Sequence, residues 1–246
     1  MKRMDDCFIH LTLTSPPYDN LREYNGYEFE FEKIAKELFR VTKDGGVVVW
    51  VVGDATIDGS ETGTSFKQAL YFIECGFNLH DTMIFKKNSP PFPSTNRYYQ
   101  VFEYMFILSK GKPTTVNLIK DRANKSFGQK KIRGKSWQKD GREIKPTFYQ
   151  ANKKKGIRTN IWNYLVGFQN EKTGHPAVFP EKLAADHIYS WSNEGELIYD
   201  CFMGSGTTAK MAHLQKRNWI GSEISKEYTE LANKRIKKYI NQTTLF

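Results

Sequence analysis

The sequence predicts an α/β fold with a mostly parallel, doubly wound sheet that carries one basic insertion. Strand patterns and helix patterns alternate on both sides of residues 109–160, which is the order that parallel βαβ units produce. The inserted residues lack a sustained helical or alternating pattern. Apolar residues make up 39% of the 246 residues and charged residues 26%, so the chain can bury a core of ordinary size.

The first half of the chain supplies the start of the predicted sheet. Residues 8–14 (FIHLTLT) alternate and are β-branched, which predicts a strand that stops at Ser15-Pro16-Pro17. Asp44-Gly45-Gly46 predicts the end of the preceding helix, and residues 47–52 (VVVWVV) predict a strand buried on both faces. The other elements expected here are helices over 29–40 and 64–75 and strands over 81–86 and 101–108.

The second half repeats the alternation after the insertion. A helix is expected over 180–192 with Pro180 in its first turn, because proline lacks the N–H that a first turn leaves unpaired. The elements that follow are strands over 196–200 and 219–222 and helices over 207–216 and 226–239. The two halves therefore predict one sheet.

The positive charge is concentrated in the insertion. The chain has 37 Lys and Arg against 27 Asp and Glu, a net charge of +10, and residues 109–160 hold 16 of the basic residues and three of the acids. Phe127, Trp137, Phe148 and Tyr149 lie among these charges, a mixture that suits a nucleic acid backbone with bases to stack on. A solvated, partly disordered loop is an equally good interpretation of the charge alone.

Composition excludes several classes of protein. The three cysteines are widely scattered and form no disulfide framework, which predicts a reducing, cytoplasmic location. The longest apolar run, residues 47–52, is too short to cross a bilayer, and residues 1–7 contain no apolar leader segment. Because the histidines show no metal-ligand spacing, we expect no metal.

A glycine loop, residues 200–208 (DCFMGSGTT), lies between a predicted strand and a predicted helix. Its glycines allow a tight turn and close approach to a ligand, and the helix N-terminus favours an anionic group. Glu223 ends the next strand, where a carboxylate can bind ribose hydroxyls. The Walker spacing is absent, which disfavours a nucleoside triphosphate. Gly204, Gly206 and Ala209 would fit a dinucleotide, but only about 40 residues follow. Asp200 suits the ammonium group of S-adenosylmethionine.

A proline loop, residues 13–18 (LTSPPY), follows the first predicted strand and so lies on the carboxyl edge of the sheet, where open α/β folds bind ligands. The Pro16 carbonyl and the Ser15 side chain can accept both hydrogens of an exocyclic amine, which directs the nitrogen lone pair toward an electrophile. Tyr18 offers a flat face for stacking a base. Alone, the segment fits a simple proline turn, but its pairing with the glycine loop favours the functional interpretation.

Together these motifs resemble the site-specific DNA amino-methyltransferases that act on cytosine N4 or adenine N6. Ser15-Pro16-Pro17-Tyr18 matches the catalytic loop of that family. The cofactor loop, written DPFxGxGT, is matched by Asp200, Phe202, Gly204, Gly206 and Thr207, with Cys201 in place of the proline. His175-Pro176-Ala177, with Pro180, Glu181, Lys182 and Leu183, resembles the HPxxxP-x-x-L element that precedes the cofactor loop. The order of the motifs matches the circularly permuted, beta-type subgroup.

The resemblance implies a Rossmann-like sheet of the S-adenosylmethionine-dependent methyltransferase type. It implies a catalytic half over 1–108, a target-recognition insertion over 109–160 that contacts double-stranded DNA, and a cofactor-binding half over 161–246. Its catalytic residues would be Ser15, Pro16, Pro17 and Tyr18. Its cofactor-binding residues would be Asp200, Phe202, Gly204, Ser205, Gly206, Thr207, Glu223, His175 and Pro176. A cognate restriction endonuclease and a homodimer are open as partners.

Three questions stay open at this stage. Ser15 at the head of the catalytic loop resembles the N4-cytosine form, whereas adenine enzymes more often carry Asp or Asn there, so we favour cytosine N4 over adenine N6. Methylation of RNA or protein amides is an alternative, although those enzymes usually place the cofactor loop first. A DNA-binding relative that has lost catalysis is another, because residues 1–7 do not supply the additional first strand that is usual in the family.

Overall fold

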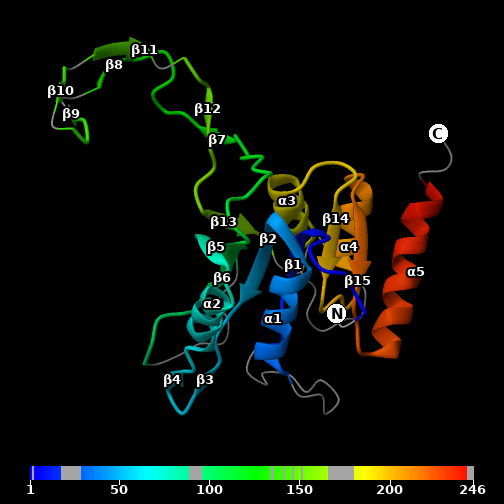
Figure 1. The fold of residues 1–246 in the computed structure, drawn as a ribbon. Coiled ribbons are helices and arrows are strands. Elements are labelled where there is room, and N and C mark those ends of the chain that lie inside the picture. The colour runs from blue at the N-terminus through cyan, green and yellow to red at the C-terminus, as the bar shows by residue number, and fades with distance from the viewer. Residues whose placement is uncertain are drawn as a thin grey trace. The chain divides into compact units, whose positions relative to one another are not determined.

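The computed structural model describes residues 1, 3–17, 29–88, 96–133, 136–140, 142–145, 147–150, 152–165 and 180–242. It divides into two compact units (Figure 1). We call Met1–Asn117 with Asn160–Phe246 the sheet unit and Leu118–Thr159 the ribbon unit.

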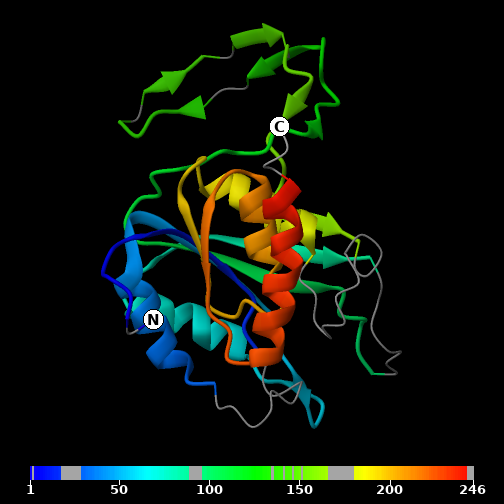
Figure 2. The ribbon, with the colours of Figure 1, turned by 90° about the vertical axis from the view of Figure 1, so that its right-hand side faces the viewer.

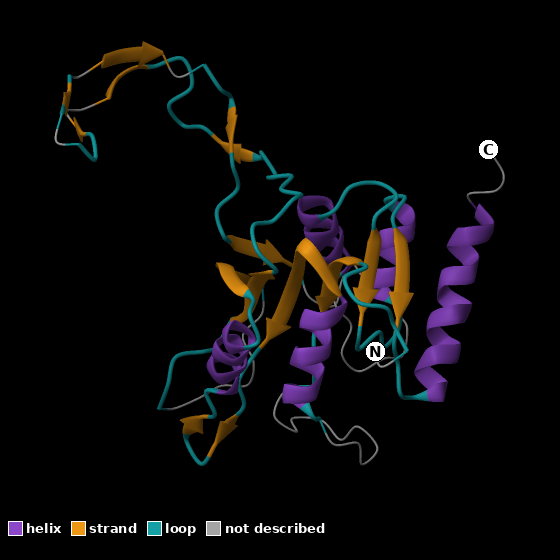
Figure 3. Cartoon of the chain, in the orientation of Figure 1, coloured by secondary structure: helices purple, strands orange, loops and turns teal. Residues whose placement is uncertain are grey.

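The sheet unit is built on a seven-stranded sheet with the strand order β13-β5-β6-β2-β1-β14-β15 (Figure 3). Strand β6 runs antiparallel to both of its neighbours, and every other adjacent pair is parallel. The strands are β1 (Ile9–Thr14), β2 (Thr42–Val52), β5 (Asn78–Lys87), β6 (Phe102–Ser109), β13 (Ile161–Tyr164), β14 (Leu197–Asp200) and β15 (Asn218–Gly221). A small hairpin follows β2 and consists of β3 (Thr56–Ile57) and β4 (Ser60–Glu61). The predicted α/β fold with a mostly parallel sheet is confirmed.

Helices cover both faces of this sheet (Figure 2). They are α1 (Phe31–Val41), α2 (Thr64–Glu74), α3 (Glu181–Trp191), α4 (Thr207–Leu214) and α5 (Lys226–Gln242). Helices α1 and α2 share one apolar cluster with Trp50 of β2 and Phe106 of β6. Met105, the residue next to Phe106, contacts His187 of α3, and successive residues of a strand point to opposite faces. Helix α3 therefore lies on the other face, where it packs against α4, and α4 packs against α5.

The glycine pair before residue 47 lies inside strand β2 and not ahead of it. Strand β2 already begins at Thr42, and its register against β1 shifts between Ile9 and Leu11. Gly45 takes a left-handed conformation (φ 78°) and donates its N–H to the Lys110 carbonyl at 2.6 Å. The pair therefore forms an irregularity within the strand, of the kind that a bulge produces. Helix α1 ends at Val41, before the pair, and the strand begins five residues earlier than the predicted residue 47.

Strand β13 is an element that the sequence pattern did not indicate. It pairs in parallel with β5, and Trp162 is buried against the His187 ring at a centroid distance of 4.6 Å. Four residues are too few for the alternation typical of a strand to be recognised. The position of β13 at the edge of the sheet is therefore known only from the structure.

The ribbon unit is a two-stranded antiparallel ribbon made of three nested strand pairs. From base to tip they are β7 (Arg122–Ala123) with β12 (Lys155–Gly156), β8 (Lys130–Arg133) with β11 (Thr147–Gln150), and β9 (Ser136–Trp137) with β10 (Glu143–Ile144). Gln138 closes the tip by donating its N–H to the Arg142 carbonyl at 2.8 Å. The basic insertion thus holds regular pairing that its sequence did not predict.

Candidate active site at the junction of β1 and β14

The carboxyl ends of β1 and β14 form the point where the sheet changes its winding direction. Helix α1 links β1 to β2 across one face, and α4 links β14 to β15 across the other. Since β1 and β14 are adjacent and parallel, the chain leaves their ends toward opposite faces. Such a divergence opens a crevice, which is the usual ligand site of open α/β sheets. The proline loop and the glycine loop leave the sheet at this point.

A buried hydrogen-bond cluster joins the two loops. The Asp200 carboxylate, on a residue only 6% exposed, accepts hydrogen bonds from the hydroxyls of Thr14 and Thr208, both at 2.6 Å. It also accepts one from the Phe202 N–H at 3.0 Å. Burial raises the pKa of the Asp200 carboxyl above its ordinary value, although these hydrogen bonds oppose the rise. The cluster fixes the start of the proline loop against the start of the glycine loop.

The proline loop is described as far as Pro17. Pro16 is buried, while Ser15 and Pro17 are partly exposed. Tyr18 lies outside the described residues. Ser15 therefore sits directly after a strand whose last residue, Thr14, is bonded to the glycine loop.

The glycine loop turns through two left-handed residues, Gly204 (φ 49°) and Gly206 (φ 79°). A Cβ on Gly206 would lie 3.0 Å from the Ala232 side chain and 3.1 Å from that of Ile236, so α5 leaves no room for a larger residue. Gly206 is the N-cap of α4 and gives the helix no side-chain cap. The first amides of α4 are thus available to an anion, for which a helix N-terminus is favourable.

Glu223 lies beside the glycine loop, on the segment that follows β15. Its carboxylate accepts hydrogen bonds from the Gly204 N–H at 2.7 Å and from the Ser225 N–H at 2.9 Å. A carboxylate offers about four acceptor positions, so these two bonds leave capacity for the ribose hydroxyls that the sequence analysis expects.

Phe202, Cys201 and Ser205 pack the loop onto its surroundings. The Phe202 ring meets Trp50 edge to face at 6.3 Å between centroids. Cys201, at the family's proline position, is buried, and burial raises the pKa of its thiol. Ser205 is buried as well and accepts a hydrogen bond from Arg235 of α5 through its carbonyl at 3.1 Å.

The remaining expected site residues differ in what the structure says of them. His175 and Pro176 lie outside the described residues. Thr207, the first residue of α4, accepts a hydrogen bond from Arg235 at 3.0 Å. Sequence reasoning missed Thr14, Thr208 and Arg235. A detectable signal existed for Arg235, because it lies between Ala232 and Ile236 on the buried side of α5, where a charged residue requires a partner.

The glycine loop and Glu223 together offer groups that fit S-adenosylmethionine. The ligand combines a carboxylate, two positive centres, a ribose and an adenine ring. The uncapped N-terminus of α4 suits the carboxylate, and the Glu223 carboxylate suits the ribose diol. Gly204 lets the backbone come close to a ligand without a side chain in the way.

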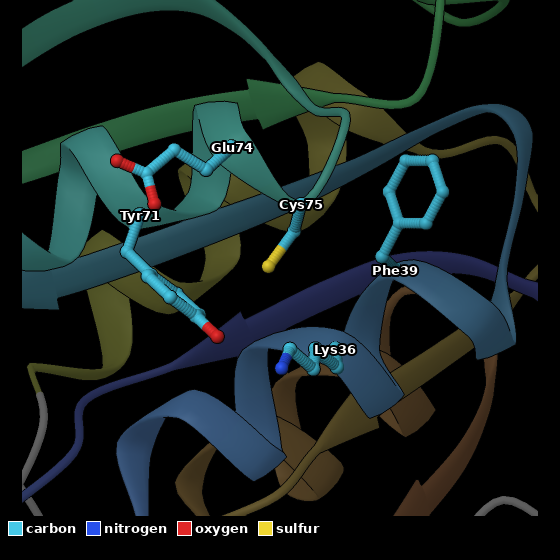
Figure 4. Close-up of a pocket in the computed structure, with 5 residues that line it drawn as sticks. All are labelled: Lys36, Phe39, Tyr71, Glu74 and Cys75. Atoms are coloured by element: carbon cyan, nitrogen blue, oxygen red, sulfur yellow. The ribbon is translucent and has the colours of Figure 1, made fainter.

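A shallow pocket elsewhere is not part of this site. It lies between α1 and α2 and is lined by Lys36 and Phe39 from α1 and by Tyr71, Glu74 and Cys75 from α2 (Figure 4). Most of these residues lie at or next to the C-terminal turns of the two helices, with Cys75 just after the end of α2, and these turns lead into the amino ends of β2 and β5. The pocket therefore lies toward the opposite edge of the sheet.

Two further observations concern the described residues. Among them, no group of three or more His, Cys, Asp or Glu side chains could hold a metal ion. None of the helices that the structure describes is long and apolar enough to span a membrane.

Comparison with known proteins identifies the class. The chain belongs to the DNA methylase family of N6 and N4 methyltransferases, whose family model matches residues 9–234. It is thus an S-adenosylmethionine-dependent DNA amino-methyltransferase, as the motifs implied.

Among individual proteins, the chain is 60% identical to the orphan methyltransferase M.BamHII of Bacillus amyloliquefaciens over 245 residues, covering 97% of this chain and 92% of the relative. Its fold is similar to that of the cytosine-N4-specific PvuII DNA methyltransferase, with a TM-score of 0.68, 19% identity, and coverage of 98% of this chain and 87% of that chain. The structure of the M1.HpyAVI–SAM complex matches with a TM-score of 0.60 and 21% identity over 93% and 89% of the two chains.

Proposed function

We propose that this methyltransferase modifies cytosine N4 at a specific DNA sequence, using the proline loop to hold the amine and the glycine loop to hold the cofactor. One observation carries the proposal. The 2.6 Å hydrogen bond between Thr14 and Asp200 joins the ends of β1 and β14, so that Ser15 follows a residue in direct contact with the cofactor loop. An amine held at Ser15 would be next to a cofactor held at Gly204 and Gly206.

The residues of the chain would act mainly by placement. S-adenosylmethionine supplies a methyl group that is already strongly electrophilic. The Pro16 carbonyl and the Ser15 side chain would accept the two amine hydrogens, which aligns the nitrogen lone pair for in-line attack. Tyr18 would stack on the base after it is flipped out of the duplex, because a stacked base cannot reach the site. Ser15 is a weak base, so the proton would leave late, to solvent.

The choice of cytosine rests on the proline loop. Cytosine N4 and adenine N6 present the same arrangement of ring nitrogen, carbon and amino group, so the placement above serves both. Ser15 at the head of the loop resembles the N4 form of the family. The fold neighbour PvuII DNA methyltransferase is cytosine-N4-specific, which is consistent with that choice.

The ribbon unit would make the sequence-specific DNA contact. It carries 14 of the chain's basic residues and three acids, and its Lys125, Lys130 and Lys154 are exposed. Trp137 lies at the end of β9 next to the tip and is 65% exposed. A two-stranded antiparallel ribbon has dimensions that the major groove admits, and lysines suit the phosphates on either side of it.

The product of the reaction tests this proposal. The full chain is expressed in a host without DNA methylation, and the nucleosides of its DNA are separated and weighed by mass spectrometry. We expect N4-methylcytosine, and long-read sequencing should place it in one recurring sequence. N6-methyladenine as the sole product would refute the choice of base. The absence of both, with intact binding to DNA, would favour a relative that has lost catalysis.

A further inference from the structure

Three charged side chains meet beside the cofactor loop. They are Glu181, the first residue of α3, Lys210 of α4 and Arg235 of α5. Lys210 and Arg235 both donate to the same Glu181 oxygen, at 2.7 Å and 2.6 Å. The side chain of Arg235 is 3% exposed and that of Lys210 is 7% exposed. We call these three residues the charge cluster.

Arg235 is the member that touches the loop. One terminal nitrogen donates to the Ser205 carbonyl at 3.1 Å and to the Thr207 hydroxyl at 3.0 Å, and the other donates to Glu181. Its two loop contacts flank Gly206, the left-handed N-cap of α4. A planar guanidinium can donate hydrogen bonds in two fixed directions at once. A lysine ammonium on a flexible side chain does not fix the direction of its hydrogen bonds.

Both cations of the charge cluster share the Glu181 carboxylate. Lys210 places its ammonium 4.5 Å from the centre of the Tyr239 ring. Burial alone would lower the pKa of Lys210, but its hydrogen bonds to Glu181 and Tyr239 raise it, so that the side chain stays charged. The loop that Arg235 contacts leads into the uncapped first amides of α4, which favour an anion.

We propose that Arg235 is a positioning residue for the cofactor loop, held in its orientation by Glu181, and that this pair sets the affinity for S-adenosylmethionine and not the rate of methyl transfer. The inference rests on the proposed assignment of the loop to the cofactor. It adds that the start of α3, a different element of the sheet unit, is coupled to cofactor binding through Glu181. Glu181 stands within the segment that resembles the HPxxxP-x-x-L element, and Arg235 lies outside the matched motifs.

The test measures cofactor binding separately from methyl transfer. S-adenosylmethionine is titrated calorimetrically into the full chain and into Arg235→Met, and steady-state rates on DNA are measured in parallel. We expect the dissociation constant of Arg235→Met to rise about 10- to 100-fold, the effect of losing charge-assisted hydrogen bonds. The rate at saturating cofactor should stay within about threefold of the parent. Arg235→Lys keeps the positive charge but cannot donate to the loop and to Glu181 at the same time in the fixed geometry of a guanidinium, so it should recover only part of the affinity.

Two further variants make the result decisive. Lys237→Met removes one positive charge from an exposed position of the same helix and should bind like the parent. Glu181→Asp keeps the charge but withdraws the carboxylate, so it should weaken binding by an intermediate factor. If circular dichroism shows that Arg235→Met does not fold, the affinity of Glu181→Asp for S-adenosylmethionine tests the inference in its place. Parental affinity in Arg235→Met, or in Glu181→Asp when the former is unfolded, would overturn the inference, as would a fall in rate without a change in affinity.

The proposed function and this inference fail in different ways. A parent chain that binds no S-adenosylmethionine would contradict the assignment of the loop itself. A parent chain that binds it but makes no N4-methylcytosine would contradict the base choice, while the comparison of dissociation constants would still decide the role of Arg235.

Discussion

The sheet unit and the ribbon unit hold their polar groups in opposite ways. At the ends of β1 and β14, the polar side chains are buried and bonded to one another, as Asp200 is to Thr14 and Thr208. In the ribbon unit, the backbone is paired while side chains such as Lys130 and Trp137 are exposed. The proposed role of the β1–β14 junction is to place reacting atoms, which requires side chains held in fixed positions. The proposed role of the ribbon unit is to contact DNA, which requires side chains that are exposed to solvent.

The difference separates two kinds of mutation. A change at the β1–β14 junction should alter cofactor binding or the chemical step on every DNA sequence. A change in the ribbon unit should alter the affinity for DNA and its dependence on salt, and leave cofactor binding as it is. The following predictions test that separation.

The largest effect is expected for Ser15→Ala. Removal of the hydroxyl takes away one of the two acceptors proposed for the amine, so transfer of tritiated methyl to DNA should fall on the order of 100-fold. The dissociation constant of S-adenosylmethionine should stay within about twofold. Ser60→Ala, at an exposed position of strand β4, is the matched control and should behave like the parent. Parental activity in Ser15→Ala would show that the proline loop does not hold the amine.

A smaller effect, visible in stability, is expected for Asp200→Asn. Because burial raises the pKa of Asp200, the folded chain holds this proton to a higher pH than the unfolded chain does. In that interval, which begins near the ordinary pKa of about 4, the free energy of unfolding contributed by this group should fall by about 1.4 kcal/mol per pH unit as the pH rises.

The amide of Asp200→Asn does not ionise, so this fall should be missing in the variant. The measurement is urea unfolding of both proteins between pH 4 and pH 8, within the range that each tolerates. The variant should gain stability relative to the parent as the pH rises. A difference that is constant with pH would contradict a raised pKa at this carboxyl.

The smallest effect is expected for a single lysine of the ribbon unit. Lys130→Met removes one exposed charge proposed to lie near phosphate, so DNA affinity should fall a few-fold on all sequences. The slope of log affinity against log salt should decrease by about one. Lys234→Met, on exposed α5 of the sheet unit, is the control. An unchanged slope for Lys130→Met would place this lysine outside the DNA contact.

Most of the sheet unit could be predicted because its elements carry strong local patterns. The stretch from β14 through α4 to β15 combines a short apolar strand, a glycine turn and a helix, and it was found within two residues at every boundary. Strand β13 and the start of β2 were not, since both depend on pairing with β5 and β1, which are distant in sequence. The strands of the ribbon unit were not predicted because lysines and arginines occupy positions where a strand would usually show alternating apolar and polar residues.

The candidate site divides in the same way. Ser15, Gly204, Gly206 and Glu223 stand in motifs or at strand ends, so their types and positions pointed to a ligand. Thr14 and Arg235 act through contacts with residues far along the chain, and Thr208 through Asp200, eight residues before it. Of these three, only Arg235 had a signal in its neighbours, the apolar Ala232 and Ile236 on the same side of α5.

The ribbon unit is a single excursion of the chain, and both of its ends are tied to the sheet unit. Asn117 donates its N–H to the Ser190 carbonyl at 2.8 Å, and the Asn160 carbonyl accepts the Ile84 N–H at 2.8 Å. These anchors lie on α3 and β5, and the Asp200 cluster uses neither. An ancestor could therefore have exchanged everything between the two asparagines for another insert without rebuilding its catalytic apparatus, and a protein engineer could graft a new insert at the same two points.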